Sequence, residues 1–140
     1  MVGDEFLEVM GMQLSEGRDF TKKLLTDVGN AYVINETMVK KMGWEQPLGK
    51  RIQMGTNGRV IGVVKDFHFA SLHNQVEPIA LHRFPDQLPP QMRIFLILHI
   101  AGEEISRTLS FLEDKFAEFD PRHPFSPDFL DDSLNDLYLD

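Results

Sequence analysis

The 140-residue sequence contains no cysteine, which excludes disulfide bonds, thiolate nucleophiles and cysteine-ligated zinc. A chain of this length does not need such cross-links, because it can bury enough apolar surface to fold as an ordinary domain. Hydrophobic residues make up 42% of the sequence and charged residues 26%, as in globular rather than disordered proteins. We therefore expect a folded domain, in a compartment that the absence of cysteine leaves undecided.

Long apolar runs are also missing. The longest covers residues 94–98 and reaches Ile100 across His99, far short of the roughly 20 residues that a membrane-spanning helix needs. The first residues lack the pattern of a secretory signal. A helical pattern in the last residues is still running at Asp140, so we expect the chain to be part of a longer protein.

Basic residues are few, with 14 Lys and Arg against 22 Asp and Glu and a net charge of −8. Their longest groupings are pairs such as Lys22-Lys23 and Lys40-Lys41. A surface that neutralises many phosphates is therefore not expected, which argues against nucleic-acid binding. The same scarcity argues against docking on anionic lipid through basic clusters.

The N-terminal part of the chain alternates helical and strand patterns. We predict a helix over Asp4–Met10 capped by Asp4, a strand over Ala31–Ile34, a helix capped by Asn35 that runs through Met42 to Gly43, a hairpin of Lys50–Met54 and Arg59–Lys65 around a turn at Gly55–Gly58, and a strand over Pro78–Phe84. Prolines 85, 89 and 90 then interrupt the pattern.

The C-terminal part predicts one buried strand and two helices. Residues 93–100 are apolar on both alternating faces, which is typical of a central strand. Glu103 and Glu104 precede a helical stripe made by Ile105, Leu109, Leu112, Phe116 and Phe119, and Ser126-Pro127 begins a last helix that reaches Tyr138. The predicted fold class is α+β, with mixed sheet and packed helices, in two lobes that comprise residues 1–90 and 91–140.

The sequence shows no catalytic constellation. Asp66, His68 and His73 offer carboxylate and imidazole groups, but their spacing fits no strong metal signature, and the other histidines are scattered. No serine has a nucleophile-elbow context, and the acidic C-terminal residues lack the spacing of a calcium loop. We therefore assign no catalytic, metal or cofactor-binding residue and predict that the protein is not an enzyme.

Several motifs follow one another in an order that resembles a known family. They are Phe6–Met12, Glu16–Phe20, Val33–Glu36, Pro47–Arg51 and Val60–Leu72, followed by the closing segment Pro124–Asp132. Each motif alone is weak, but their common order over one domain-sized chain makes coincidence improbable. The chain resembles the MacB-like periplasmic core domain of ABC transporter permeases, the MacB/FtsX-type permease family.

This resemblance implies a non-catalytic domain on the periplasmic side of the cytoplasmic membrane. Residues 1–90 would form the sabre-like lobe, and residues 91–140 the C-terminal half of the porter-like lobe leading to a membrane helix. The implied partners are transmembrane helices of the same permease, an ABC ATPase domain or subunit, a second permease copy and a periplasmic accessory protein. The domain would transmit ATP-driven conformational change to an exported substrate or accessory protein, and no cofactor is implied.

The candidate interaction or structural residues come from these motifs: Gly17, Arg18, Asp19, Phe20, Asn35, Glu36, Asp66, Phe67, Ser71 and Leu72. They place candidate contact surfaces in the loops over residues 17–30 and 66–75. A structural interpretation of the first four, as a glycine turn, a charged pair and a buried anchor, is favoured over recognition.

Two other functions remain open at this point. The aromatic segment Phe67–Leu72 could line the ligand cleft of a stand-alone soluble binding module. A small hydrolase or metal-dependent enzyme would require histidine and carboxylate side chains that converge in one cleft.

Overall fold

The computed structural model describes residues 2–3, 5–21, 23–54, 56–67, 76–83 and 95–130. The chain divides into two compact units, of which the first comprises residues 1–68 and 72–97 and the second residues 69–71 and 98–140. The division into lobes at residue 90 stays a prediction.

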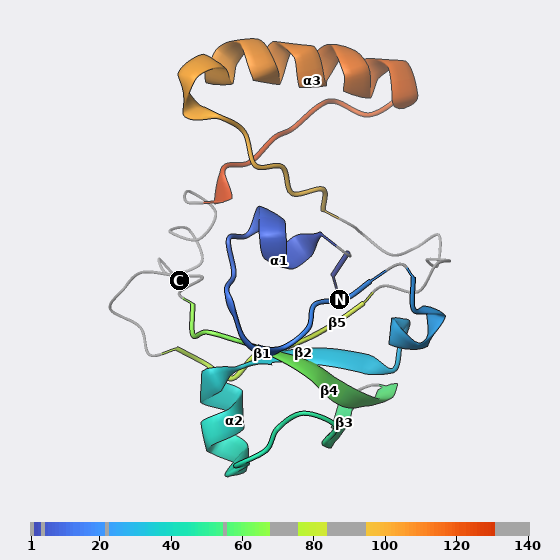
Figure 1. Ribbon diagram of the computed structural model, residues 1–140. Helices are drawn as coiled ribbons and strands as arrows, with labels where there is room; N and C mark the ends of the chain where they lie inside the picture. Colours follow the sequence, from blue (N-terminus) through green and yellow to red (C-terminus); the bar gives the residue numbers. More distant parts are fainter. Residues whose placement is uncertain are drawn as a thin grey trace, which may run out of the picture. The chain divides into compact units, whose positions relative to one another are not determined.

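Five strands in the described part of the first unit form one mixed sheet (Figure 1). They are β1 (Leu14–Gly17), β2 (Ala31–Asn35), β3 (Arg51–Met54), β4 (Thr56–Val64) and β5 (Ala80–His82), and the helices are α1 (Phe6–Val9), α2 (Glu36–Met42) and α3 (Ile105–Phe119). The order is β1–β4–β2–β5, and β3 pairs with the first half of β4. Only β2 and β4 run parallel among these pairs, so the predicted α+β class with a mixed sheet is confirmed.

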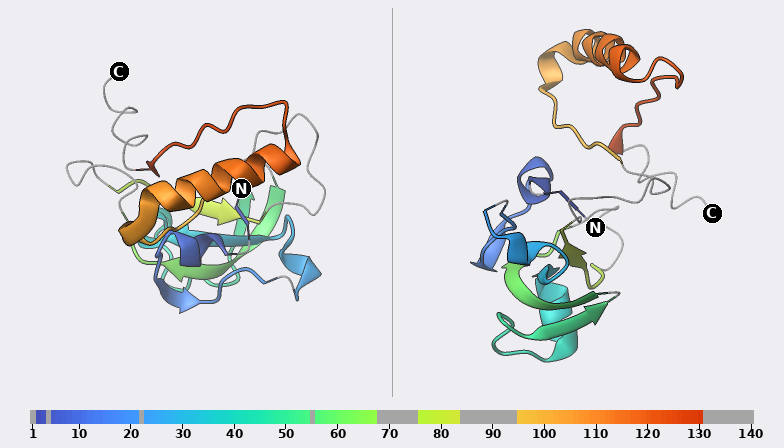
Figure 2. Two further views of the ribbon diagram at one scale, coloured as in Figure 1. Left: turned by 90° about the horizontal axis from the view of Figure 1, so that it is seen from above. Right: turned by 90° about the vertical axis from the view of Figure 1, so that its right-hand side faces the viewer.

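The core of the first unit lies on both faces of β2, whose five residues are all buried. Ala31 and Val33 pack with Leu7 of α1 in one hydrophobic cluster, whereas Tyr32 and Ile34 belong to a second cluster that includes α2. The views of Figures 1 and 2 show α1 and α2 on opposite faces of the sheet. Because helices cover both faces of the sheet, β2 has no polar side, which agrees with the apolar composition from which a strand was predicted here.

Helix α2 follows the prediction closely. Asn35 accepts a hydrogen bond from the Met38 N–H through Oδ1 at 3.0 Å, and Gly43 ends the helix in a left-handed conformation. Helix α1 is shorter than predicted. Glu5 occupies its N-cap position without a side-chain hydrogen bond, and the predicted cap, Asp4, lies outside the described residues. A single turn gains little from a cap, so the burial of Leu7 anchors α1 instead.

The hairpin of β3 and β4 is confirmed, but its turn is shorter than predicted. Thr56 lies opposite Met54, so Thr56 to Gly58 belong to β4 rather than to the turn. The buried Tyr32 hydroxyl explains this, because it donates to the carbonyl of Met54 or Thr56, at 3.0 and 2.9 Å. The Tyr32 ring also occupies the space in which a Cβ on Gly58 would lie, 2.6 Å from its Cε2. Glycine is therefore needed at position 58 to leave room for the Tyr32 ring, and not to form the turn.

The strand predicted over Pro78–Phe84 is present as the shorter β5, which pairs antiparallel with β2. Phe84 and the prolines that follow it lie outside the described residues.

The described part of the second unit contains α3, a single 3-10 turn over Gly102–Glu104 before it, and segments without regular structure. Helix α3 matches its predicted stripe and ends before Asp120, and the Phe116 and Phe125 rings lie 5.8 Å apart. The last predicted helix does not begin at Ser126-Pro127, because residues 124–129 form neither helix nor strand. Leu130 is helical, and the rest of the predicted helix lies outside the described residues. No described helix has both the length and the apolar character needed to cross a membrane.

The central strand predicted over residues 93–100 is wrong for residues 95–100, which form no strand. Phe95 and Leu96 are 87% and 84% exposed. A buried strand needs hydrogen-bonded neighbours on both edges, and within the described residues no strand pairs with this segment. Apolar composition therefore predicted strand character, but burial also requires neighbouring strands, and no described strand pairs with this segment.

Candidate functional site

The first group of motif residues follows β1, where two glycine backbones meet. Gly17 lies opposite Gly62 of β4 and has a φ of +77°. A Cβ on Gly17 would lie 2.3 Å from the Ile61 carbonyl oxygen, far inside van der Waals contact. The motif thus needs glycine here for both its backbone angle and its closeness to β4. The next residue, Arg18, donates its N–H to the same Ile61 carbonyl at 3.0 Å.

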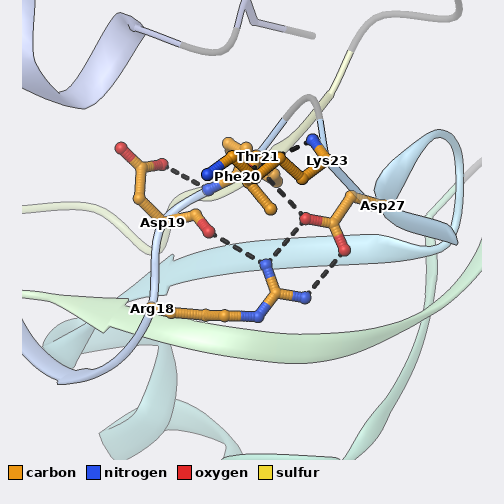
Figure 3. A network of polar contacts seen from close by, with 6 residues as sticks. All are labelled: Arg18, Asp19, Phe20, Thr21, Lys23 and Asp27. Atoms are coloured by element: carbon orange, nitrogen blue, oxygen red, sulfur yellow. Dashed lines mark hydrogen bonds and ion pairs between the residues drawn. The ribbon is translucent and has the colours of Figure 1, made fainter. Parts of the chain in front are cut away.

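From this position the Arg18 side chain meets Asp27 in a two-pronged ion pair (Figure 3). Nη1 lies 2.7 Å from Oδ2 of Asp27, and Nη2 lies 2.8 Å from Oδ1. The Asp27 side chain is 2% exposed, whereas that of Arg18 is 42% exposed. The fork of a guanidinium matches the two oxygens of a carboxylate, so the pair fixes the loop between β1 and β2 at both of its ends.

Further hydrogen bonds order the loop around this pair, as Figure 3 shows. Asp19 accepts the Phe20 N–H at 2.6 Å through Oδ1, and its carbonyl accepts from Nη1 of Arg18 at 3.0 Å. The Thr21 N–H donates to Asp27 at 3.3 Å. Phe20 itself is 6% exposed and belongs to the core cluster that contains Leu7. Gly17 and Phe20 fit the structural interpretation of residues 17–20, whereas the ion-pair partner of Arg18 is Asp27, a residue outside this motif.

The environment of Asp27 stabilises its ionised form. Hydrogen bonding from Arg18 lowers the pKa of the Asp27 carboxyl below its ordinary value, although burial acts in the opposite direction. The charge of Arg18, the Thr21 N–H and the charge of Arg83 lower this pKa further. Sequence reasoning missed Asp27, because its only signal was an acidic residue in a turn just before a strongly apolar strand.

The second group lies at the opposite end of β2 and is centred on Asn35. Its Oδ1 accepts the N–H groups of Met38 and Ile79, at 3.0 and 2.9 Å, and its Nδ2 donates to the Glu77 carbonyl at 2.8 Å. The side chain is buried. Asn35 therefore joins the end of β2, the start of α2 and the segment that leads into β5, whereas the sequence predicted only the helix cap.

Asp66 reaches the start of α2 because β2 and β4 run parallel and end together, with Asn35 opposite Val64. The Asp66 carboxylate accepts the Thr37 N–H at 2.8 Å and the Thr37 hydroxyl at 2.9 Å. Lys40 Nζ lies 3.7 Å from the same carboxylate. This carboxylate satisfies a backbone donor in the first turn of α2 and binds the helix to the end of β4.

The remaining motif residues add less to the site. Glu36 begins α2, where its charge favours the helix N-terminus. Phe67 is half-buried after β4. Ser71 and Leu72, with most of the loop over residues 66–75, lie outside the described residues, as do His68 and His73. The structure thus places the described motif residues in two groups, one before β2 and one at its end.

The described histidines occupy separate environments. The His82 ring lies on β5 with its centroid 5.5 Å from that of Tyr32, and its buried Nδ1 has no hydrogen-bond partner in the described structure. Burial lowers the pKa of His82 below its ordinary value. His123 Nδ1 lies 2.7 Å from a carboxylate oxygen of Asp120, and His99 is exposed. Among the described residues, no three His, Cys, Asp or Glu side chains are grouped to hold a metal ion.

Comparison with known proteins identifies the family of this chain. The model of the MacB-like periplasmic core domain matches residues 1–87, while no curated protein matches the chain. A domain of a putative permease protein from Porphyromonas gingivalis has a similar structure, with a TM-score of 0.53 and 16% identity over 93% of this chain and 68% of that one.

The periplasmic region of MacB from Actinobacillus actinomycetemcomitans is also similar, with a TM-score of 0.48 and 22% identity. That match covers 84% of this chain but only 54% of the MacB region, so the chain spans about half of that structure. The family match covers more than half of the chain. The chain therefore belongs to the MacB-like periplasmic core domain family, as its motifs predicted.

Proposed function

We propose that this member of the family is the extracytoplasmic domain of an ABC transporter permease. Its parent protein would lie in the cytoplasmic membrane, with this domain on the periplasmic side. Family membership and the likeness of its fold to the Porphyromonas gingivalis permease domain support this placement. The domain would carry out no catalysis and would transmit ATP-driven conformational change to an exported substrate or an accessory protein.

The observation that carries the mechanical part of this proposal is the cross-bracing of the first unit. Asn35 binds three segments through one buried amide, and Asp66 binds α2 to the end of β4. At the other end of β2, Arg18 and Asp27 hold the loop that follows β1. A body with both ends of its central strand fixed in this way moves as one piece, and a lever needs that property.

The contact surface of this lever would be the loop over residues 17–30. Arg18 and Asp27 fix its backbone, while Lys23, Leu24 and Thr26 are exposed beyond them. Leu24 is 42% exposed. A loop that is ordered before binding loses little conformational entropy when a partner docks on it. An accessory protein or exported substrate could therefore bind here without reorganising the domain.

The other proposed partners follow from the function. Transmembrane helices of the same permease would carry the motion to the domain, and an ABC ATPase domain or subunit would supply its energy. A second permease copy would complete the transporter.

A topology measurement on the full-length parent protein tests the proposed placement. Reporters that are active only on one side of the membrane are inserted immediately before Asp4 and immediately after Asp140. We expect both junctions to report the periplasmic side in a membrane-embedded product. Cytoplasmic signals from a soluble product would contradict the proposed function and favour a stand-alone binding module.

A further inference from the structure

The β3–β4 hairpin and the segments beside it carry an excess of positive charge in an otherwise acidic chain. Residues 37–65 contain six of the 14 basic residues of the sequence but only one of its 22 acidic residues. Two of the six, Arg51 and Arg59, lie opposite each other in the first pair of the hairpin, and a third, Lys50, directly precedes β3. We call these three residues the hairpin cation cluster.

The hairpin cation cluster is not neutralised within the described structure. Arg59 donates from Nη1 to the carbonyl of Gly49 at 2.9 Å, a neutral acceptor, and no described carboxylate forms an ion pair with any of the three cations. Like charges directly opposite each other on antiparallel strands are unfavourable for stability. Apart from the hydrogen bond of Arg59, no described contact compensates for this repulsion, which points to a ligand outside the domain.

A free strand edge lies beside the cluster. Within the described residues, β3 pairs only with β4. The Lys50 carbonyl accepts from the Val60 N–H at 2.9 Å. Because hydrogen bonding alternates along an antiparallel strand, the N–H and C=O groups of Arg51 and Gln53 point away from β4. Arg51, Gln53 and Met54 are all exposed, so these backbone groups are available to another strand.

We propose that the outer edge of β3 binds an extended acidic segment of a partner protein as an added strand, whose carboxylates pair with the hairpin cation cluster. Added strands gain their affinity from main-chain hydrogen bonds and their specificity from alternate side chains. Arginine is suited to carboxylates, because its planar fork binds both oxygens. The same cations repel a second copy of β3 or a basic strand, so an acidic strand is the partner that the charges select.

This inference goes beyond the proposed function, because it identifies a class of partner and a surface separate from the loop over residues 17–30. It rests on that function only in assuming that the partner is a protein of the same compartment. The binding itself can be measured with the chain alone. A negative result would leave the topology measurement unaffected, and a cytoplasmic topology would not abolish binding of the peptide.

The test is an NMR titration of the isotopically labelled chain with a short blocked peptide of alternating glutamate and valine. We expect shifts centred on residues 51–54 and slower exchange of the Arg51 and Gln53 amides. A matched peptide of lysine and valine should cause neither change. The proposal would be overturned if the chain bound vesicles of anionic lipid but not the acidic peptide. It would also be overturned if the peptide caused shifts spread over other basic residues.

Two variants separate charge from strand addition. The double variant Arg51→Glu, Arg59→Glu should weaken peptide binding by about tenfold or more, whereas Lys41→Glu with Arg122→Glu, which changes the net charge equally at exposed positions elsewhere, should not. Gln53→Pro removes an outward N–H without breaking the ladder to β4 and should abolish amide protection at the edge. If thermal unfolding shows that Gln53→Pro is folded and the peptide still binds it normally, strand addition is wrong.

Discussion

The guanidinium of Arg18 and the carboxylate of Asp27 face each other through two parallel contacts of 2.7 and 2.8 Å. One partner is buried and the other partly exposed, so the pair links the surface of the loop before β2 to the interior. The ionic hydrogen bonds are stronger than neutral ones. If this pair contributes strongly to stability, the loop before β2 is held in one conformation and presents a fixed surface.

Replacement of Asp27 by asparagine should lower the free energy of unfolding by about 1.5–3 kcal/mol, because the charged acceptor of both guanidinium contacts is lost. Urea denaturation monitored by circular dichroism measures the change. Glu16→Gln, which alters an exposed acidic residue of β1, serves as the matched control and should stay within about 0.5 kcal/mol of the original protein. An equal loss in both variants would show that the pair contributes nothing specific.

Asn35 is predicted to act through all three of its hydrogen bonds. Asn35→Ala should cost about 2–4 kcal/mol, since it leaves the N–H groups of Met38 and Ile79 and the carbonyl of Glu77 without their side-chain partner. Asn35→Asp keeps both acceptor bonds but loses the donor, so its cost should be smaller. In chemical denaturation, an Asn35→Asp variant as stable as the original protein would show that the bond to Glu77 contributes nothing, and equal costs of the two variants would show that the acceptor bonds contribute nothing.

Gly17 is predicted to be irreplaceable because of its neighbours as well as its backbone angle. Gly17→Ala should cost more than about 3 kcal/mol or prevent folding, since the new Cβ would overlap the Ile61 carbonyl. Gly11 provides the control, because it has a similar φ of +64° but nothing within 4 Å of the added Cβ. Gly11→Ala should therefore cost only about 1–2 kcal/mol. Thermal unfolding of the two variants separates crowding from backbone strain.

His82 should make stability depend on pH near neutrality. Burial lowers its pKa in the folded state below the ordinary value of 6.5, so the unfolded chain binds the proton more tightly. The stability that His82 contributes is complete above pH 6.5 and is lost as the pH falls through its folded pKa. His82→Phe should therefore reduce the fall in unfolding free energy below pH 6.5, whereas His99→Phe, at an exposed position, should retain it. Identical profiles for His82→Phe and the original protein would contradict this assignment.

Local sequence signals predicted most of the first unit. Asn35 and Gly43 predicted the two ends of α2, and the apolar composition of residues 31–34 predicted a strand there, because capping and strand propensity depend on residues close in sequence. The hairpin was predicted for the same reason. Its turn was misplaced because Gly58 serves the ring of Tyr32, a contact that spans the sheet and leaves no local pattern.

The contacts that organise the candidate site were less predictable. Arg18 was identified from its motif, but its partner Asp27 was not, because a bidentate pair across a loop has no fixed spacing. The contact of Asp66 with Thr37 depends on the parallel pairing of β2 and β4. Phe95 and Leu96 illustrate a different error, because their apolar segment was predicted to be buried and is exposed. Composition alone does not show whether neighbouring strands are there to cover a segment.

The most direct test of the proposed lever is a pair of spin-label distance measurements on the full-length parent protein, with its native cysteines removed. Labels at Glu16→Cys and Lys41→Cys, both exposed in the first unit, report distances within one copy, and a single label at either position reports the distance between two copies. Trapping ATP should leave the distance within one copy unchanged and shift the distance between copies. A changed distance within the unit, or an unchanged distance between copies, would contradict transmission of ATP-driven motion by a rigid extracytoplasmic domain.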